Sequence, residues 1–99
     1  LAPALLAVLP KDAPANHAAR KQVKYRAGRA FFEFKRGSAK IAGQATVQSC
    51  GSQYAAERVA RALWVKLEQG ASTQEMMRFR KDCYDAIRKV RGGAAGDEE

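Results

Sequence analysis

The chain has 99 residues, of which 28% are charged, and a formal net charge of +8 at pH 7. This length suffices for one small domain with a single core, and it excludes a second domain or a large substrate cleft. The positive charge favours polyanions or acidic membranes as partners and says little about the fold.

The positive charge is concentrated in one part of the chain. Residues 11–40 contain nine basic and two acidic residues, whereas the other sixty-nine contain nine basic and eight acidic ones. A solvated, solubilising surface also produces such a run, but its concentration in one arm and the first strands favours phosphate binding. The candidate nucleic-acid-binding residues are Arg20, Lys21, Lys24, Tyr25, Arg26, Arg29, Lys35, Arg36 and Lys40.

Residues 1–22 are predicted to form an extended arm, apolar at first and then basic, with a helical turn near Ala18. The start without methionine indicates a processed product or a piece of a longer chain, and the first ten residues, with Pro3 and Pro10, are too short to span a bilayer. Because exposed leucines here would promote aggregation, we expect a neighbouring protein to cover them.

Three β-strands are predicted at about 23–27, 29–35 and 40–48, where apolar and polar residues alternate. Turn residues separate them at Ala27-Gly28 and Arg36-Gly37-Ser38, and Gly43 indicates a weakened strand or a bulge. One face of such a sheet packs on a helix and the other is free to meet a ligand. Alternation assigns Phe32 and Phe34 to the packed face and leaves Tyr25 and Phe31 unassigned.

Two helices are predicted at about 53–69 and 73–90. Ser52 suits the N-cap of the first and Gly70 its end, while Ser72 and Glu75 form a capping box for the second. Gly92-Gly93 is expected to end the second helix. The apolar stripe of the first comprises Ala56, Val59, Ala60, Leu63, Trp64 and Leu67, with Glu57, Arg58, Arg61 and Lys66 in solvent; that of the second comprises Met76, Phe79, Cys83, Ile87 and Val90.

These elements predict an α+β domain over residues 23–91 in the order βββαα. A three-stranded antiparallel sheet packs on a helix, and a second helix follows it. Residues 92–99 are expected to be a mobile acidic tail.

Residues suited to catalysis or metal binding do not occur together in the sequence. His17 is the single histidine, in a polar linker where we expect it to be solvated. Cys50 and Cys83 lie outside any Cys-x-x-Cys pair and are expected to be small buried residues, with a disulfide as the alternative. Since no nucleophile-base pair or phosphate-binding glycine loop is present either, we expect a protein that is not an enzyme and has no cofactor or metal.

The segment from Gln22 to Gln69 resembles the Apetala-type domain, the ethylene-response-factor-like DNA-binding module, and especially its divergent apicomplexan form. The resemblance lies in two strand aromatics seven residues apart, Tyr25 and Phe32, and in the run CGSQYAAERVARAL. The family has tryptophans where this chain has those two aromatics. The resemblance implies that the sheet enters the DNA major groove and that the contacts come from Lys24, Arg26, Arg29, Glu33 and Lys35.

The run SQYAAERVARALWVKL, residues 52–67, is also similar to the final helix of double-stranded-RNA-binding domains. The two lysines with which that family grips phosphates correspond here to Gln53 and Tyr54. This resemblance therefore ranks second.

Both resemblances and the charge distribution indicate a nucleic-acid partner. The prediction is a structural RNA-binding subunit of a ribonucleoprotein, such as a mitochondrial ribosome. The apolar start, the basic arm and the apolar stripe of the 73–90 helix suit a protein that contacts rRNA and neighbouring proteins. The alternatives are a sequence-specific DNA-binding transcription factor of the Apetala type, in the nucleus, and an interaction module for an acidic protein.

Overall fold

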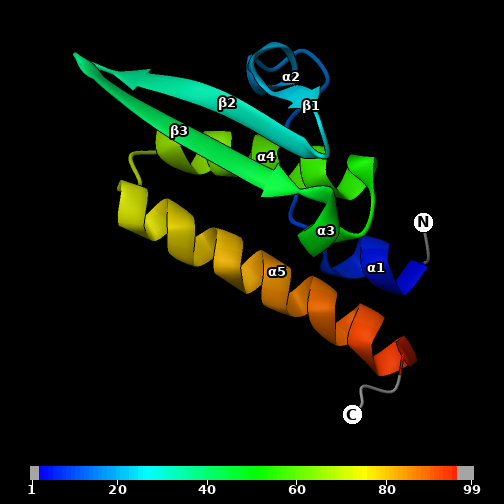
Figure 1. The fold of residues 1–99 in the computed structure, drawn as a ribbon. Helices are drawn as coiled ribbons and strands as arrows, with labels where there is room; N and C mark the ends of the chain where they lie inside the picture. The colour runs from blue at the N-terminus through cyan, green and yellow to red at the C-terminus, as the bar shows by residue number, and fades with distance from the viewer. Residues whose placement is uncertain (1–2, 96–99) are drawn as a thin grey trace.

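A three-stranded antiparallel sheet and two long helices dominate the computed structural model, which describes residues 3–95 (Figure 1). The elements are α1 (Pro3–Val8), α2 (Ala19–Gln22), β1 (Lys24–Arg26), β2 (Arg29–Arg36), β3 (Ala39–Thr46), α3 (Val47–Cys50), α4 (Gln53–Glu68) and α5 (Thr73–Ala95). The strand order is β1-β2-β3. The predicted α+β fold, with a three-stranded antiparallel sheet followed by two long helices, is confirmed, and the short helices α1, α2 and α3 are added to it. No helix within residues 3–95 has both the length and the apolar character needed to cross a bilayer.

Two-residue turns set the register of the sheet. Ala27 and Gly28 both have positive φ angles, 52° and 82°, as a type I′ turn requires, and Gly37, with a φ of 60°, fits the first position of a type II′ turn. Arg26 therefore pairs with Arg29, and Arg36 with Ala39.

Ala27 should be a point of backbone strain, because an alanine side chain disfavours the left-handed region. We expect Ala27→Gly to raise the free energy of unfolding by about 0.5–1 kcal/mol. Urea denaturation provides the measurement. Gly28→Ala is the matched control: a Cβ at Gly28 meets nothing within 4 Å, so its expected loss of stability reports the backbone alone. A destabilised Ala27→Gly variant would contradict this interpretation.

The core lies between the sheet and α4, which packs against β2 and β3 (Figure 1). Ala56 and Ala60 of α4 are fully buried, and their small size lets the helix approach the strands. Trp64 meets the rings of Phe32 and Phe34 edge-on, with centroid distances of 5.5 and 4.8 Å. The predicted packed face of the sheet and the apolar stripe of α4 are both confirmed.

Gly43 does not mark a bulge, because Phe32 and Gly43 lie directly opposite each other in an uninterrupted register. The ring of Phe32 instead occupies the space that a side chain would fill. A Cβ added at Gly43 would lie 2.6 Å from Cε2 and 2.9 Å from Cε1 of that ring. The glycine is thus required by the close approach of an aromatic side chain from the neighbouring strand.

The predicted helix caps are confirmed. Ala55 donates its backbone N–H to Ser52 Oγ at 3.1 Å, and Gly70 follows α4 with a φ of 100°. Glu75 donates its backbone N–H to Ser72 Oγ at 3.0 Å, and Ser72 N–H donates to Glu75 Oε1 at 2.8 Å, which completes the capping box.

The two predicted element ends near residues 48 and 92 are wrong. The third strand ends at Thr46, because its Oγ1 accepts the N–H of Ser49 at 3.1 Å and so caps the helical turn α3. The helix α5 continues through Gly92-Gly93 to Ala95, since those glycines keep helical geometry. The rest of the predicted tail, residues 96–99, lies outside the described residues.

The predicted extended arm is instead folded onto the domain. Leu5 and Leu9 are buried where the start of the chain contacts α5, whereas Leu6 stays exposed, so the chain itself covers part of its apolar start. The expected helical turn near Ala18 is α2. His17 is not simply solvated: its Nδ1 accepts the N–H of Ala19 at 3.0 Å, which leaves Nε2–H to donate to Glu68 Oε1 at 2.8 Å.

An ion-pair cluster fixes the arm to α4. Arg61, which the sequence pattern places in solvent, is buried, and its Nε and Nη2 donate to the two carboxylate oxygens of Asp12 at 2.8 and 3.0 Å. Arg20 Nη2 donates to Asp12 Oδ2 at 3.1 Å, and Arg58 Nε donates to Pro10 O at 2.8 Å.

Candidate nucleic-acid interface

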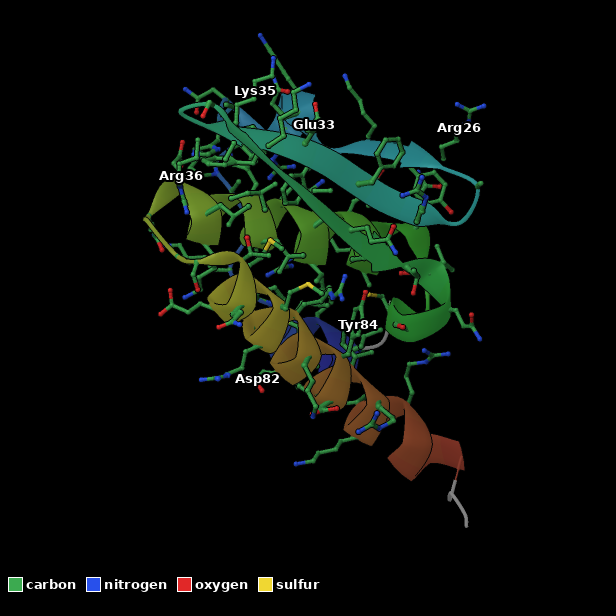
Figure 2. All side chains as sticks on the ribbon, turned by 60° about the vertical axis from the view of Figure 1, so that its left-hand side comes forward. Arg26, Glu33, Lys35, Arg36, Asp82 and Tyr84 are labelled. Atoms are coloured by element: carbon green, nitrogen blue, oxygen red, sulfur yellow. The ribbon has the colours of Figure 1, made fainter. Side chains whose placement is uncertain are left out.

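The strand register separates the side chains of the sheet into two faces. Ala30 and Phe32 of β2 are buried toward α4, whereas Arg29, Glu33 and Lys35 are exposed on the other side. Figure 2 shows Glu33 and Lys35 on the side of the sheet away from the helices and Arg36 beside α4. We call the side away from α4 the outer face; its residues are Lys24, Arg26, Arg29, Phe31, Glu33, Lys35, Lys40, Ala42, Gln44 and Thr46.

On the outer face, basic residues of neighbouring strands lie directly opposite each other. Its five basic residues and one acidic residue leave an excess of four positive charges. Arg26 pairs with Arg29 at one end of the sheet, and Lys35 pairs with Lys40 at the other. Glu33 lies 4.0 Å from Lys40 Nζ, and both side chains are exposed, so this ion pair offsets little of the repulsion. Like charges directly opposite each other destabilise a sheet.

Two neighbouring side chains orient Arg29 on this face. Its guanidinium carbon lies 4.6 Å from the centroid of the Phe31 ring, and its Nη1 donates to Gln44 Oε1 at 2.8 Å. A guanidinium held by stacking and one hydrogen bond keeps its other N–H donors for a ligand and loses little side-chain entropy on binding.

Five of the nine predicted site residues lie together on the outer face: Lys24, Arg26, Arg29, Lys35 and Lys40. Lys21 is exposed on the short helix α2. Tyr25 pairs with Ala30 and therefore lies on the opposite side of the sheet from Phe31.

The remaining two predicted site residues have partners inside the protein. Arg20 binds the Asp12 carboxylate and the Ala13 carbonyl. Arg36 donates to the Leu67 carbonyl at the end of α4 and lies over the Phe34 ring at 5.6 Å. Their guanidinium groups thus stabilise the fold.

Gln44 is the residue of the outer face that the sequence interpretation missed. Because the turn at Gly37-Ser38 has two residues, Arg36 pairs with Ala39, and counting back along both strands from that pair puts Gln44 opposite Phe31. The turn residues alone would therefore have placed Gln44 on the outer face.

The helix α5 borders the outer face along β3. Arg80 Nη1 donates to the Gln44 carbonyl at 3.1 Å, and the backbone N–H of Thr46 donates to the Tyr84 hydroxyl at 3.2 Å. Arg80 and Tyr84 thus provide hydrogen-bond partners for backbone groups at the edge of β3, which would otherwise be free to pair with a fourth strand. An open groove crosses this border, and its lining includes Lys24, Arg29, Phe31, Gln44, Met77 and Arg80.

The two cysteines are free and buried, as the sequence pattern predicts. Burial raises the pKa of Cys50 to about 12 and that of Cys83 to about 11, so neither is a thiolate at neutral pH. Within residues 3–95, no cluster of three or more His, Cys, Asp or Glu residues is placed to hold a metal ion.

Comparison of the chain with protein-family models, with curated proteins and with solved structures gives no match. The resemblance to the Apetala-type domain therefore depends on the sequence features given above.

Proposed function

We propose that this protein binds double-stranded DNA through the outer face of its sheet. The observation that carries the proposal is that two pairs of basic residues lie directly opposite each other on one exposed surface: Arg26 with Arg29, and Lys35 with Lys40. Such pairs cost stability in the free protein, and a polyanion bound across them removes that cost.

The dimensions of the sheet suit a DNA groove. Beyond Phe31 the sheet has only β2 and β3, and the major groove of B-DNA admits a two-stranded ribbon. The two basic pairs are six residues apart along β2, which is about 20 Å of strand, or six base pairs of helix axis.

Arg29 is the residue best placed to read a base. An arginine pairs with the O6 and N7 atoms of guanine through two hydrogen bonds, and a prepositioned guanidinium makes that recognition more specific. The five residues that the Apetala-type resemblance implies as DNA contacts, Lys24, Arg26, Arg29, Glu33 and Lys35, all belong to the outer face.

The test measures binding to labelled DNA duplexes by fluorescence anisotropy over a series of salt concentrations. In the triple variant Arg26→Gln/Lys35→Gln/Lys40→Gln, we expect the slope of log K against log salt to fall by about 2.7, because each lost phosphate contact contributes about 0.9. Affinity should fall about equally for all sequences. The control Lys11→Gln/Arg78→Gln/Lys89→Gln removes the same charge from exposed positions elsewhere. Equal slopes for the two triple variants would contradict the proposal.

A second variant separates base reading from charge. Arg29→Lys keeps the positive charge but loses the planar two-donor geometry. It should therefore reduce the difference in affinity between preferred and random duplexes and leave the slope of log K against log salt unchanged.

A structural RNA-binding subunit is the second candidate, and the partly exposed ring of Phe31 beside Arg29 favours it, because such a ring can stack on an unpaired base. The other sequence features that favoured an RNA-binding subunit, the apolar start and the basic arm, now support it less, since Leu5 and Leu9 are buried within the chain and Arg20 binds Asp12. Tighter binding to single-stranded RNA than to duplex DNA, with loss of that binding in Phe31→Ala, would favour this candidate.

A further inference from the structure

The helix α5 presents a basic stripe on the side that borders β3. Arg80 and Tyr84 contact β3, and Arg91 Nη1 donates to the Gln48 carbonyl of α3 at 3.2 Å. Met77 and Arg88 are eleven residues apart and therefore share a face, with Lys81 close to the same line. We call the set the α5 stripe: Met77, Arg80, Lys81, Tyr84, Arg88 and Arg91.

The stripe opens toward the same solvent region as the outer face. Met77 lines the groove that also contains Phe31 and Gln44. Farther along the helix, Arg88 and Arg91 line a second groove together with Gln48 and Ser49, directly after the end of β3. Charged side chains of α5 thus continue the line of the sheet beyond its last residue. Figure 2 shows Tyr84 on the side of α5 that faces the sheet and Asp82 on the side away from it.

We infer that the α5 stripe is a second contact surface for the phosphate backbone of the DNA duplex proposed to bind the outer face. This inference depends on the proposed function. It adds that one DNA strand leaves the sheet at Gln44 and continues along α5 past Arg88.

Charge and length support this assignment. The stripe contains four basic residues, of which Arg80 and Arg91 already donate to carbonyls of β3 and α3. Its neighbouring acid, Asp85, is shared between Lys81 Nζ at 2.8 Å and Arg88 Nη2 at 2.7 Å. Both basic side chains remain about three-quarters exposed, at 73% and 74%. From Arg80 to Arg91 the helix rises about 16 Å, enough to follow about five phosphates at 3.4 Å of axis each.

The same helix offers a matched control on the neighbouring part of its circumference. Arg78 lines a separate groove with Lys66 and Asp82, and Lys89 lies eleven residues farther along on the same face as Arg78. A merely solvated helix would show no difference between the two faces when equal charge is removed from each.

The experiment compares Lys81→Gln/Arg88→Gln with Arg78→Gln/Lys89→Gln in the full chain, with a duplex of at least twenty base pairs. The stripe variant should reduce the salt slope by about 1 to 2, since Asp85 already offsets part of the removed charge. The control should leave the slope unchanged. Asp85→Asn should tighten binding for every sequence, because it frees both cations. Thermal melting by circular dichroism verifies that each variant is folded.

The outcomes distinguish this inference from the proposed function. If wild type binds duplexes and the triple variant of the outer face weakens binding, but the two α5 variants behave alike, then the stripe is not a DNA contact and the outer-face proposal stands. If wild type does not bind duplexes at any salt concentration, both are overturned.

Discussion

Asp12→Ala is expected to lower the free energy of unfolding by about 3 kcal/mol, because it leaves a buried guanidinium without its counter-charge. The Arg61 side chain is only 10% exposed, and both of its donors to Asp12 are at hydrogen-bond distance, 2.8 and 3.0 Å. The same change frees Arg20 and loosens residues 10–14, so the docking of the arm on α4 should weaken as well. Urea denaturation at pH 7 measures the loss.

The stability that Asp12→Ala removes should depend on pH. Burial alone would raise the pKa of Asp12, but the hydrogen bond and charge of Arg61, the Ala13 N–H and the Arg20 charge outweigh burial and hold the pKa below 3.8. A carboxyl with a lowered pKa in the folded state stabilises the protein above its unfolded pKa, and this contribution disappears as the pH falls through the folded pKa. The difference between wild type and Asp12→Ala should therefore narrow below pH 3.8.

Two further variants control for this interpretation. Asp12→Ala/Arg61→Leu removes both charges and should recover most of the lost stability, since an apolar replacement of a buried ion pair is well tolerated. Glu68→Ala breaks the more exposed contact with His17 and should cost less than about 1 kcal/mol. A double variant as unstable as Asp12→Ala would show that the loss comes from packing and not from the unpaired charge.

The elements that sequence reasoning predicted well are those whose cause is local. Ser52 caps α4, and Ser72 with Glu75 starts α5, because each interaction spans three residues. Gly37-Ser38 fixes a two-residue turn, and alternation then assigns the faces of β2. The five basic residues of the outer face follow from that alternation.

The features that sequence reasoning missed depend on partners far along the chain. Arg61 and Asp12 are 49 residues apart, and Arg36 reaches the Leu67 carbonyl 31 residues away. No local pattern distinguishes an arginine that binds such a partner from one that remains in solvent. Gly92 and Gly93 stay helical, whereas Gly51 and Gly70, which follow α3 and α4, adopt the left-handed conformation that commonly ends a helix.

Gly43→Ala is expected to destabilise the protein by about 2 kcal/mol, although alanine is normally the better residue within a strand. The added methyl group would overlap the Phe32 ring, which is 4% exposed and lies between the sheet and α4. The ring has no free space to enter, because Trp64 packs against it at a centroid distance of 5.5 Å. To relieve the overlap, the backbone of the sheet or of α4 must therefore move.

The background variant Phe32→Leu decides whether this overlap is the cause. Phe32→Leu alone should lower stability, since it removes the edge-on contact with Trp64. In that background the Gly43→Ala change should cost little or should stabilise the strand, because the ring atoms that it would strike are gone. Urea denaturation of all four proteins gives the coupling between the two positions. An equal cost of Gly43→Ala in both backgrounds would contradict the ring overlap and would indicate that the backbone at position 43 needs glycine.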